Sequence, residues 1–427
     1  MRHRSWVLVL VVSCSLLSGA TPAQSLRITF RALDGGRAAV QDIRIRALVV
    51  AQNGTLYAGG MGTASVVDAS GNIVNPHGPR GSAFLVSHDH GATWTIRLTP
   101  ASALSPMWTD HTRWPINFTV YQMAVDPQHP RTIYAAGVTN GGGFHSLVRS
   151  VDGSHTWQDV LFYKRIFNGG NNYTLQTNIV VTPTTRVTVA QLGRPVGITL
   201  VIDPRDPRRL YLGTATAGVL RSTDAGTSWI YNSRSPSVLT GVAEQLVLDP
   251  QRTQTLYALV QGTTFAQLYR TDDGGMIWRS LWHGGYASGV LLEGSTLYLV
   301  RSDGIYASTD RGTHWRLAVN ARALPGFTMR TTFGLAGTVV QALHHAGVWY
   351  AVDNNAVKPD LTGLFATSTA GASWRLLTTG LRGPQGALAG PIDDGNQTVM
   401  WIDAAAHPPV LLTASQVNGL YRWSVMP

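Results

Sequence analysis

Short apolar runs, separated by glycine, proline, asparagine or aspartate, follow one another along almost the whole chain. Within the runs apolar and polar positions alternate, as in "TLYAGG", "TIYAAG" and "RLYLGT". Alternation with a period of two residues is typical of β-strands. No long helical period is found, and 45 glycines with 21 prolines suit many tight turns. The pattern predicts an all-β protein of many short strands.

A polar loop that ends in tryptophan recurs between these strands. Clear copies are "SHDHGATW" (87–94), "STDAGTSW" (222–229) and "STDRGTHW" (308–315), with weaker copies at 150–157, 271–278 and 367–374. In the last copy Thr369 stands where the others carry aspartate. A catalytic constellation is built once, whereas a folding unit is repeated. The aspartate can accept N–H bonds within its own turn, and the glycine permits a positive φ. We therefore predict a structural role for the loop aspartates: Asp89, Asp152, Asp224, Asp273 and Asp310.

A second repeat places a tyrosine in a strand that precedes each loop. These tyrosines are Tyr57, Tyr134, Tyr211, Tyr257, Tyr298 and Tyr350. Another strand lies between the tyrosine strand and the loop, and one more follows the tryptophan. Four antiparallel strands repeated seven times predict a seven-bladed β-propeller. The roughly 400 residues after position 25 give seven units of about forty to sixty residues, near the size of a propeller blade.

The two ends of the chain are predicted to complete one blade. The last repeat, "GLYRWSVMP", stops after its third strand, whereas "ITFRAL" (28–33) resembles the strands that follow the tryptophans, with Phe30 in the tryptophan position. We expect residues 28–33 to close the propeller as the outer strand of the last blade, which removes an exposed sheet edge. Residues 26–427 are then a single domain.

The motif Ser-x-Asp-x-Gly-x-Thr-Trp resembles the Asp-box, also called the BNR repeat, over roughly residues 27–427. That repeat is shared by sialidases, xyloglucan-cutting endoglucanases, sortilin-type receptors and photosystem-assembly propellers. The order of Asp-Pro turn, tyrosine strand and Asp-box is most similar to the photosystem-assembly type and its bacterial relatives. The resemblance implies the propeller fold, with the loops on the face opposite the active site. It leaves the function open, because one fold carries many functions.

Residues 1–25 have the features of a bacterial signal peptide: two arginines, an apolar run from Trp6 to Leu17 and small residues near position 23. The run is too short to span a membrane comfortably. The only cysteine, Cys14, lies in "VVSC", which resembles a lipobox, so lipid attachment at Cys14 is the alternative to cleavage near Ala23. We expect a secreted or extracytoplasmic protein, membrane-bound only if Cys14 is lipidated, without a disulfide or a cysteine nucleophile.

Composition narrows the chemistry further. The formal net charge is +10, almost all of it from arginine, which favours an acidic polymer, a polysaccharide or a protein as partner. Many arginines recur within the repeats, so we read them as strand positions and expect no nucleic-acid binding. No phosphate-binding or metalloprotease motif is present. His88 and His90 occupy variable positions of a turn, so no metal site is predicted. We expect a monomer that holds no cofactor.

Two classes of function remain. The leading interpretation is a non-catalytic binding or scaffold module for an acidic or carbohydrate ligand. The alternative is a glycoside hydrolase of the sialidase type, which needs an arginine cluster, a tyrosine nucleophile with a glutamate, and an aspartic acid. Its weak catalytic candidates are Glu244, placed before an inner strand, and Asp110. The sialidase "RIP" signature and the paired aspartates of the endoglucanases are not recognisable.

Two long segments, 98–119 and 160–195, are predicted to join the first three blades on one face. Long loops in a compact fold often carry function, and exposed aromatics beside charged groups suit a sugar or an acidic chain. The candidate ligand-binding residues are Trp108, Asp110, His111, Arg113, Trp114, Tyr163, Lys164 and Arg165. Alternatively, Trp108 and Trp114 fill the mouth of the propeller.

Overall fold

The fold is given by a computed structural model. It describes residues 26–27, 30–31, 42–63, 66–67, 73–75, 80–99, 117–140, 144–167, 173–177, 179–181, 197–214, 218–231, 241–262, 265–285, 287–301, 303–324, 338–354, 363–377, 399–403, 410–415 and 419–424. The chain divides into two compact units. Unit 1 comprises Met1–Ile28, Thr264–Leu268 and Leu281–Pro427, and unit 2 comprises Thr29–Thr263 and Tyr269–Ser280. The single domain over residues 26–427 stays a prediction.

Three sheets lie wholly in unit 2. The first has the order β2-β8-β7-β4-β3, with β2 (Phe30–Arg31), β3 (Asp42–Val50), β4 (Leu56–Thr63), β7 (Arg80–Ser87) and β8 (Trp94–Thr99). The second has the order β13-β12-β11-β10-β9, with β9 (Asn117–Val125), β10 (Ile133–Asn140), β11 (Phe144–Ser150), β12 (Gln158–Phe167) and β13 (Tyr173–Thr177). The third has the order β14-β18-β17-β16-β15, with β14 (Ile179–Val181), β15 (Gly197–Ile202), β16 (Leu210–Thr214), β17 (Val219–Ser222) and β18 (Trp229–Tyr231). A short ribbon pairs β5 (Val66–Val67) with β6 (Ile73–Asn75).

Three further sheets lie in unit 1, and one sheet takes residues from both units. The shared sheet is β19 (Val242–Leu248), β20 (Leu256–Gln261), β21 (Ala266–Thr271) and β22 (Arg279–His283). The next is β23 (Ala287–Glu293), β24 (Thr296–Arg301), β25 (Gly304–Ser308) and β26 (Arg316–Asn320). It is followed by β27 (Thr338–His345), β28 (Val348–Asn354), β29 (Gly363–Thr367) and β30 (Arg375–Leu376). The last has the order β1-β33-β32-β31, with β1 (Leu26–Arg27), β31 (Val399–Asp403), β32 (Val410–Ser415) and β33 (Gly419–Ser424).

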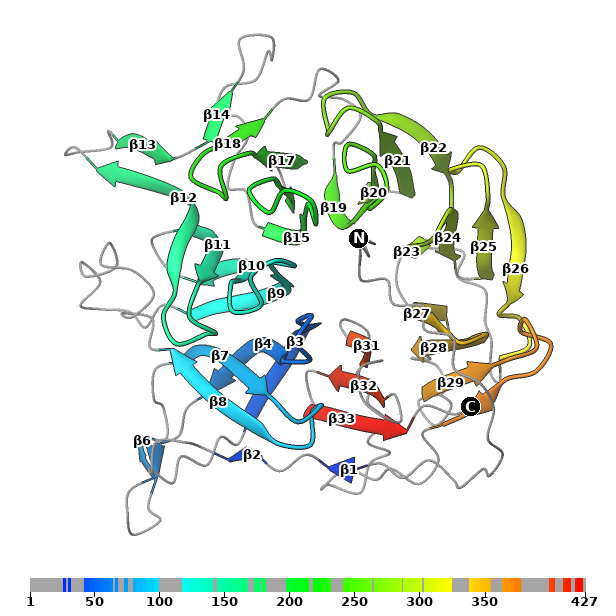
Figure 1. Ribbon diagram of the computed structural model, residues 1–427, viewed down its shortest axis with the longest axis horizontal. Helices are drawn as coiled ribbons and strands as arrows, with labels where there is room; N and C mark the ends of the chain where they lie inside the picture. Colours follow the sequence, from blue (N-terminus) through cyan, green and yellow to red (C-terminus); the bar gives the residue numbers. More distant parts are fainter. Residues whose placement is uncertain are drawn as a thin grey trace, which may run out of the picture. The chain divides into compact units, whose positions relative to one another are not determined.

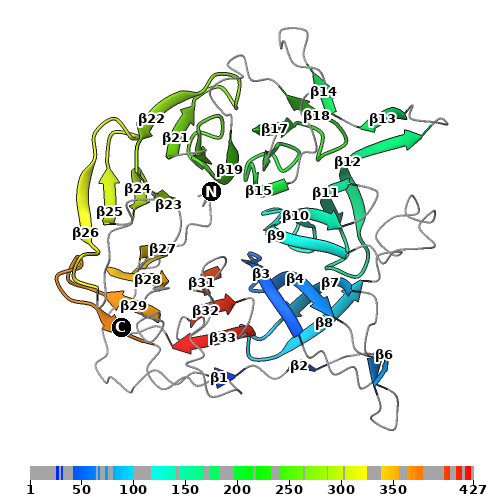
Figure 2. The same cartoon turned by 180° about the vertical axis from the view of Figure 1, so that it is seen from behind.

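The sheets have the construction of propeller blades. Within unit 2 the first strands β3, β9 and β15 lie next to one another, while the last strands β8, β12 and β18 lie apart, and Figures 1 and 2 show this from both sides. In unit 1 the first strands β23, β27 and β31 are neighbours in the same way. The prediction of an all-β propeller with antiparallel four-stranded blades is confirmed.

The number of blades depends on the ends of the chain. Six sheets contain four strands that follow one another along the chain, apart from the β5–β6 ribbon. The remaining sheet has β31, β32 and β33, and its fourth strand is the two-residue β1, which pairs Leu26 with Arg422 and Arg27 with Tyr421. The count of seven blades therefore stays a prediction.

The expected register of the N-terminal segment is wrong. Residues 28–33 were predicted as the outer strand of the last sheet, but the pairing with that sheet is made by Leu26–Arg27. Phe30–Arg31 instead forms β2, which runs parallel to β8 with Phe30 opposite Trp94. The physical reason is that β8 has an open outer edge, and a short added strand covers it. Residues 28, 29, 32 and 33 lie outside the described residues.

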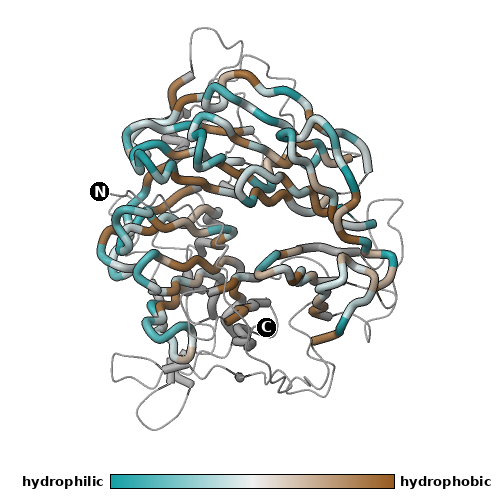
Figure 3. Tube along the Cα trace, turned by 45° about the vertical axis from the view of Figure 1, so that its right-hand side comes forward, coloured by the Kyte–Doolittle hydropathy of each residue, from teal (hydrophilic) through white to brown (hydrophobic). Residues whose placement is uncertain are grey.

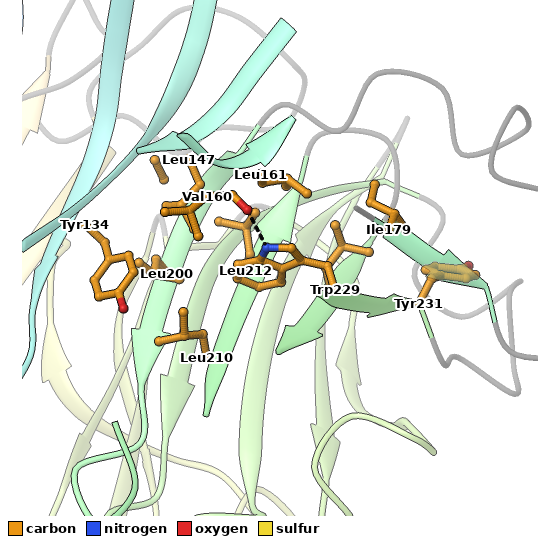
Figure 4. Packing of buried hydrophobic residues seen from close by; sticks show 12 residues of the cluster. Tyr134, Leu147, Val160, Leu161, Ile179, Leu200, Leu210, Leu212, Trp229 and Tyr231 are labelled. Atoms are coloured by element: carbon orange, nitrogen blue, oxygen red, sulfur yellow. Dashed lines mark hydrogen bonds between the residues drawn. The ribbon is translucent and has the colours of Figure 1, made fainter. Parts of the chain in front are cut away.

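β16 and β20 are buried at nearly every position, whereas buried and less buried positions are interspersed in β19. Figure 3 shows hydrophobic stretches in brown between hydrophilic ones in teal. Figure 4 shows the packing between the second and third sheets of unit 2. There the fully buried Trp229 lies among leucines of β16 and β15, and its Nε1 donates a hydrogen bond of 3.1 Å to the carbonyl oxygen of Val160 on β12. One tryptophan thus supplies both a large apolar surface and a polar link between neighbouring sheets.

The loop before Trp229 touches the preceding sheet at a glycine. Gly226 has φ of +90°, and a Cβ built on it would lie 2.0 Å from Cγ1 of Val160. Gly275, at the same place in the next loop, has φ of +91°, but its nearest atom would be Cζ2 of Trp278 at 3.8 Å. Both positions need the left-handed conformation, and only Gly226 also needs the missing side chain.

We therefore expect Gly226→Ala to destabilise the protein much more than Gly275→Ala. The control Gly275→Ala should cost only the left-handed conformation, ~1–2 kcal/mol. Gly226→Ala should add a steric cost of ~1–3 kcal/mol, because Val160 must move. Urea unfolding followed by tryptophan fluorescence measures both. Equal losses for the two variants would show that the contact with Val160 does not matter.

Candidate functional site

The repeated loops form the same hydrogen-bonded turn, which we call the Asp loop. In the third copy Ser222 Oγ donates to Asp224 Oδ1 at 2.7 Å and accepts from the Gly226 N–H at 2.8 Å. The second carboxylate oxygen of Asp224 accepts from Ser228 Oγ at 2.6 Å. The same three contacts recur around Asp89, Asp152 and, with a histidine as the last donor, Asp310. Their carboxylates are occupied by donors of their own loops.

These hydrogen bonds lower the pKa of the carboxyl groups of Asp89, Asp152, Asp224 and Asp310. For Asp152, burial raises the pKa, but the bonds from Thr156, Ser150 and the His155 N–H outweigh it and lower the pKa to about 2. The pKa values of Asp89 and Asp224 are lowered for the same reason, against the same effect of burial. A carboxyl group that stays ionised in this way is poorly suited to donate a proton. The structural role of these residues stays a prediction, which the acid-stability experiment below tests.

A second repeated feature lies in the first strand of six sheets, where one residue is inserted as a β-bulge. In β19, Ala243 pairs with Val260 and Gln245 with Leu259, so Glu244 has no partner on β20. The equivalent bulge residues are Arg46, Tyr121, Ile198, Ser288 and Val340. A bulge interrupts the inward–outward alternation and redirects a side chain, and bulges are enriched beside active sites. Sequence analysis did not single out these bulges, although one inserted residue shifts the phase of the alternation.

Within unit 2, side chains next to the bulges form hydrogen bonds to the backbone of the neighbouring first strand. Gln122, which follows the bulge residue of β9, accepts a hydrogen bond at Oε1 from the Leu200 N–H of β15. Thr199, which follows the bulge residue of β15, accepts at Oγ1 from the Leu246 N–H of β19 at 3.3 Å. Each bond runs to the residue two places after the next bulge. The bulge residues of β9, β15 and β19 therefore lie at one level, which we call the bulge level.

Glu244 is the bulge residue with the clearest potential for chemistry. Its side chain is exposed, while Ala243 and Leu246 on either side are buried. Nevertheless, desolvation by the surrounding protein raises the pKa of Glu244 above its ordinary value. The carboxyl group of Glu244 is thus accessible to solvent and partly desolvated by the protein around it. Such a group can hold a proton at a higher pH than an ordinary glutamate and deliver it to a bound molecule.

The other glutamate is placed differently. Both carboxylate oxygens of Glu293, at the end of β23, lie within 3.0 Å of Nδ1 of His344 on β27. Trp349 stacks on His344 with ring centroids 4.6 Å apart. The contact joins two sheets of unit 1 across 51 residues of sequence, which is why sequence analysis missed it. Glu293 is therefore engaged in a contact between sheets.

Most of the loop residues predicted to bind a ligand cannot be placed. Trp108, Asp110, His111, Arg113 and Trp114 lie outside the described residues. Tyr163, Lys164 and Arg165 belong to β12, paired with Thr177, Gln176 and Leu175 of β13. The expectation that 160–195 is one joining loop is thus wrong in part, because the strand after the Asp loop continues to Phe167 and turns back as a hairpin.

The described residues contain neither a candidate metal site nor a helix that could span a membrane. In the part of the chain that the structure describes, no three histidine, cysteine, aspartate or glutamate side chains are grouped so that they could hold a metal ion. The same residues include no helix that is long and apolar enough to cross a membrane.

Comparison with known proteins relates this propeller to enzymes. No family model matches the chain. It is 28% identical over 288 residues to a xyloglucanase from a Paenibacillus species, covering 59% of the chain and 26% of that protein. It is 26% identical over 298 residues to the xyloglucanase Xgh74A of Acetivibrio thermocellus, covering 60% of the chain and 32% of that protein. The alignments therefore span only about a quarter to a third of these relatives.

Among solved structures, YCF48 bound to D1 peptide superposes with a TM-score of 0.52, covering 96% of this chain and 99% of that one. At 9% sequence identity this likeness concerns the fold alone. It agrees with the propeller architecture over nearly the whole chain.

The similarity to xyloglucanases corrects the leading functional interpretation. Sequence analysis favoured a non-catalytic binding or scaffold module, but these relatives point to a glycoside hydrolase. They favour the broader class of the alternative, a glycosidase, and not its sialidase-like type. The leading interpretation relied on the Asp loops, which indicate the propeller fold but give no information about function.

We expect Asp152 to stabilise the protein at neutral pH and to lose this effect in acid. The folded pKa of about 2 lies below the ordinary value of 3.8, so the contribution is complete above pH 3.8 and disappears as the pH falls through 2. Asp152→Asn should lower the free energy of unfolding by ~1–3 kcal/mol at pH 7. Urea unfolding from pH 7 to pH 2 measures it, and a difference from the wild type that does not shrink in acid would contradict this account.

Proposed function

We propose that this chain is a glycoside hydrolase that acts on a polysaccharide of the xyloglucan type. The observation that carries the proposal is the similarity to two xyloglucanases over 288 and 298 residues. A propeller with an accessible, desolvated carboxyl group on a first strand agrees with it. Neutral polysaccharide chains present many hydroxyl groups and no charge, so recognition rests on hydrogen bonds and stacking rather than on the net charge of the protein.

We assign Glu244 the role of general acid. Most glycosidases use two carboxyl groups, one to protonate the oxygen of the leaving sugar and one to act as nucleophile or to activate water. The acid must remain protonated until the bond breaks, and the raised pKa of Glu244 favours this. Of the six bulge residues, Glu244 alone carries a carboxyl group. For the second carboxyl group Asp110 stays the candidate from sequence.

The test is hydrolysis of xyloglucan by the full-length protein, measured as new reducing ends. We expect activity in the wild type and a loss of about 10²–10⁴-fold in kcat for Glu244→Gln. Since Glu244 acts in its protonated form, wild-type activity should fall as the pH rises through its raised pKa. The alkaline limb of the pH profile should be absent from the residual activity of the variant.

Glu293→Gln is the matched control, because it removes the other glutamate, which contacts His344. It should retain the wild-type pH profile. Asp110→Asn examines the second carboxyl group in the same assay. Full activity of Glu244→Gln would remove Glu244 from the mechanism. Absence of new reducing ends from xyloglucan with the wild type would refute the proposed function itself.

We also propose that the seven sheets are blades of one closed Asp-box propeller that works outside the cytoplasm. The pairing of β1 with β33 supports closure, and the recurrence of the Asp-loop hydrogen bonds supports the Asp-box. The targeting features of residues 1–25 support the location. A polysaccharide hydrolase meets its substrate there.

Removal of residues 26–27 from the mature protein should lower its melting temperature. These two residues cover the outer edge of β33, which would otherwise expose unpaired N–H and C=O groups. The expected loss is about 4–8 °C for each kcal/mol in a small domain, and smaller in a chain of this length. Differential scanning calorimetry measures it. An unchanged melting temperature would show that the pairing of β1 with β33 does not stabilise the protein.

A further inference from the structure

Unit 1 contains an aromatic and charged cluster that sequence analysis did not single out. Arg301, at the end of β24, lies with its guanidinium carbon 4.6 Å from the ring centroid of Tyr306 on β25. The same carbon is 5.5 Å from the ring centroid of Trp282 on β22. Both distances are within the range of cation–π contacts. A planar guanidinium is thus held against two aromatic rings from neighbouring sheets.

A buried carboxylate completes the cluster. Asp303 is 8% exposed, and its Oδ2 accepts a hydrogen bond of 2.9 Å from the Tyr306 hydroxyl. Its Oδ1 lies 3.4 Å from Nε of Arg301 as an ion pair. Neither of these two atoms makes a hydrogen bond to the described residues, although both are buried. Nε of Arg301 and Oδ1 of Asp303 thus face each other as a buried ion pair whose geometry falls short of a hydrogen bond.

The cluster is partly open to solvent. The side chain of Arg301 is 29% exposed, and Trp282 and Tyr306 are half-buried. Phe265, in the turn before β21, is 51% exposed. This turn reaches the end of β22, because the Ala266 N–H donates to the carbonyl oxygen of Gly285. Phe265 therefore lies beside the end of β22, near Gly285, three residues beyond Trp282.

This end is the one away from the Asp loops. β25 begins at Gly304, beside Asp303, and ends at Ser308, where the Asp loop of Asp310 starts. β22 begins directly after the Asp loop that ends at Trp278 and reaches Trp282 four residues later. The cluster is consequently separate from the Asp loops, and Asp303 lies in the turn that joins β24 to β25.

We propose that Trp282, Arg301, Asp303 and Tyr306 form a subsite for a hexosyl residue of a neutral glucan chain. The aromatic rings can stack on the apolar face of a sugar ring, as they do on other flat partners. The guanidinium of Arg301 offers several N–H donors in one plane to the hydroxyl groups of the sugar. The Asp303 carboxylate holds the guanidinium and the Tyr306 hydroxyl in place. An anionic sugar fits less well, because Asp303 offsets the charge of Arg301.

This inference rests on the proposed function for the class of sugar, and it adds a binding subsite to that function. It concerns binding by unit 1, whereas the catalytic assignment concerns the carboxyl group of Glu244. The two can therefore be tested separately, by binding and by turnover.

The test is isothermal titration of the full-length protein with a xyloglucan oligosaccharide. Trp282→Ala and Arg301→Ala should each weaken binding about tenfold or more, the size of effect seen when a central aromatic or arginine contact is removed. Arg301→Lys should also bind more weakly, because an ammonium group lacks the planar set of donors.

Arg279→Ala is the matched control, since Arg279 is an exposed arginine on the same strand, three residues before Trp282. It should bind as the wild type does. Melting temperatures of all variants separate lost binding from lost folding, and Arg301→Lys serves if Arg301→Ala does not fold. Unchanged affinity in folded Trp282→Ala and Arg301→Lys would overturn the subsite. Tighter binding of an oligogalacturonate than of the neutral oligosaccharide would overturn the choice of a neutral sugar.

The outcomes also separate the two proposals. Xyloglucan hydrolysis with unchanged binding in the variants would refute the subsite alone. Binding that depends on Trp282, without turnover, would refute the hydrolase and leave the subsite standing.

Discussion

The whole arrangement depends on a backbone turn that ordinary residues adopt with difficulty. Each Asp loop needs two successive residues in the left-handed region, such as Ala225 and Gly226 or Arg311 and Gly312. The second is glycine in five of the six described loops, and some of these glycines lie directly against the preceding sheet: Gly226 against Val160, Gly312 against Leu281 and Gly371 against Asn320. The aspartate holds this strained turn by accepting several hydrogen bonds at once. In the second loop Ser154 takes the glycine position at a φ of 77°, with a buried hydroxyl that has no partner among the described residues.

The Asp loops occupy one end of six of the sheets. Chemistry is therefore expected at the first strands and at the other end of these sheets. The bulges use the first of these places. Gln122 and Thr199 connect successive first strands, so that an inserted residue stands at the same level in each of them. At that level Glu244 combines access to solvent with a raised pKa, which separates it from the hydrogen-bonded aspartates of the loops. The same chain therefore contains carboxyl groups whose pKa is raised and others whose pKa is lowered. The environment of each carboxyl group determines whether it can carry a proton near neutral pH.

The fold was largely predictable from sequence, and the site only in small part. Repeated tyrosine strands and Asp loops carried the prediction of antiparallel four-stranded blades, because each strand and turn is stabilised within its own few residues. The register of the N-terminal segment was not predictable in the same way: "ITFRAL" resembles an outer strand, but Phe30 lies beside Trp94 in the first sheet. Glu244 was chosen for its place before a strand, whereas the structure places it within β19 as a bulge residue. The functional class came from similarity to xyloglucanases, since a repeat that builds turns cannot report on the ligand.

By itself, then, the sequence determined the local elements: which residues form strands, which form the Asp loops, and why serine, aspartate, glycine and tryptophan recur at fixed spacing. The hydrogen bonds of the serine and the aspartate in each Asp loop join residues no more than four positions apart, so a pattern read along the chain contains them. Tertiary structure alone decided the pairings across long separations. Trp229 reaches the carbonyl of Val160 across 69 residues, Glu293 meets His344 across 51, and Arg301 is placed between Trp282 and Tyr306 by the packing of two sheets. The physical reason is that these partners come together only after the sheets have packed. The alternation along one strand does not determine which side chain of the neighbouring sheet its residues will contact.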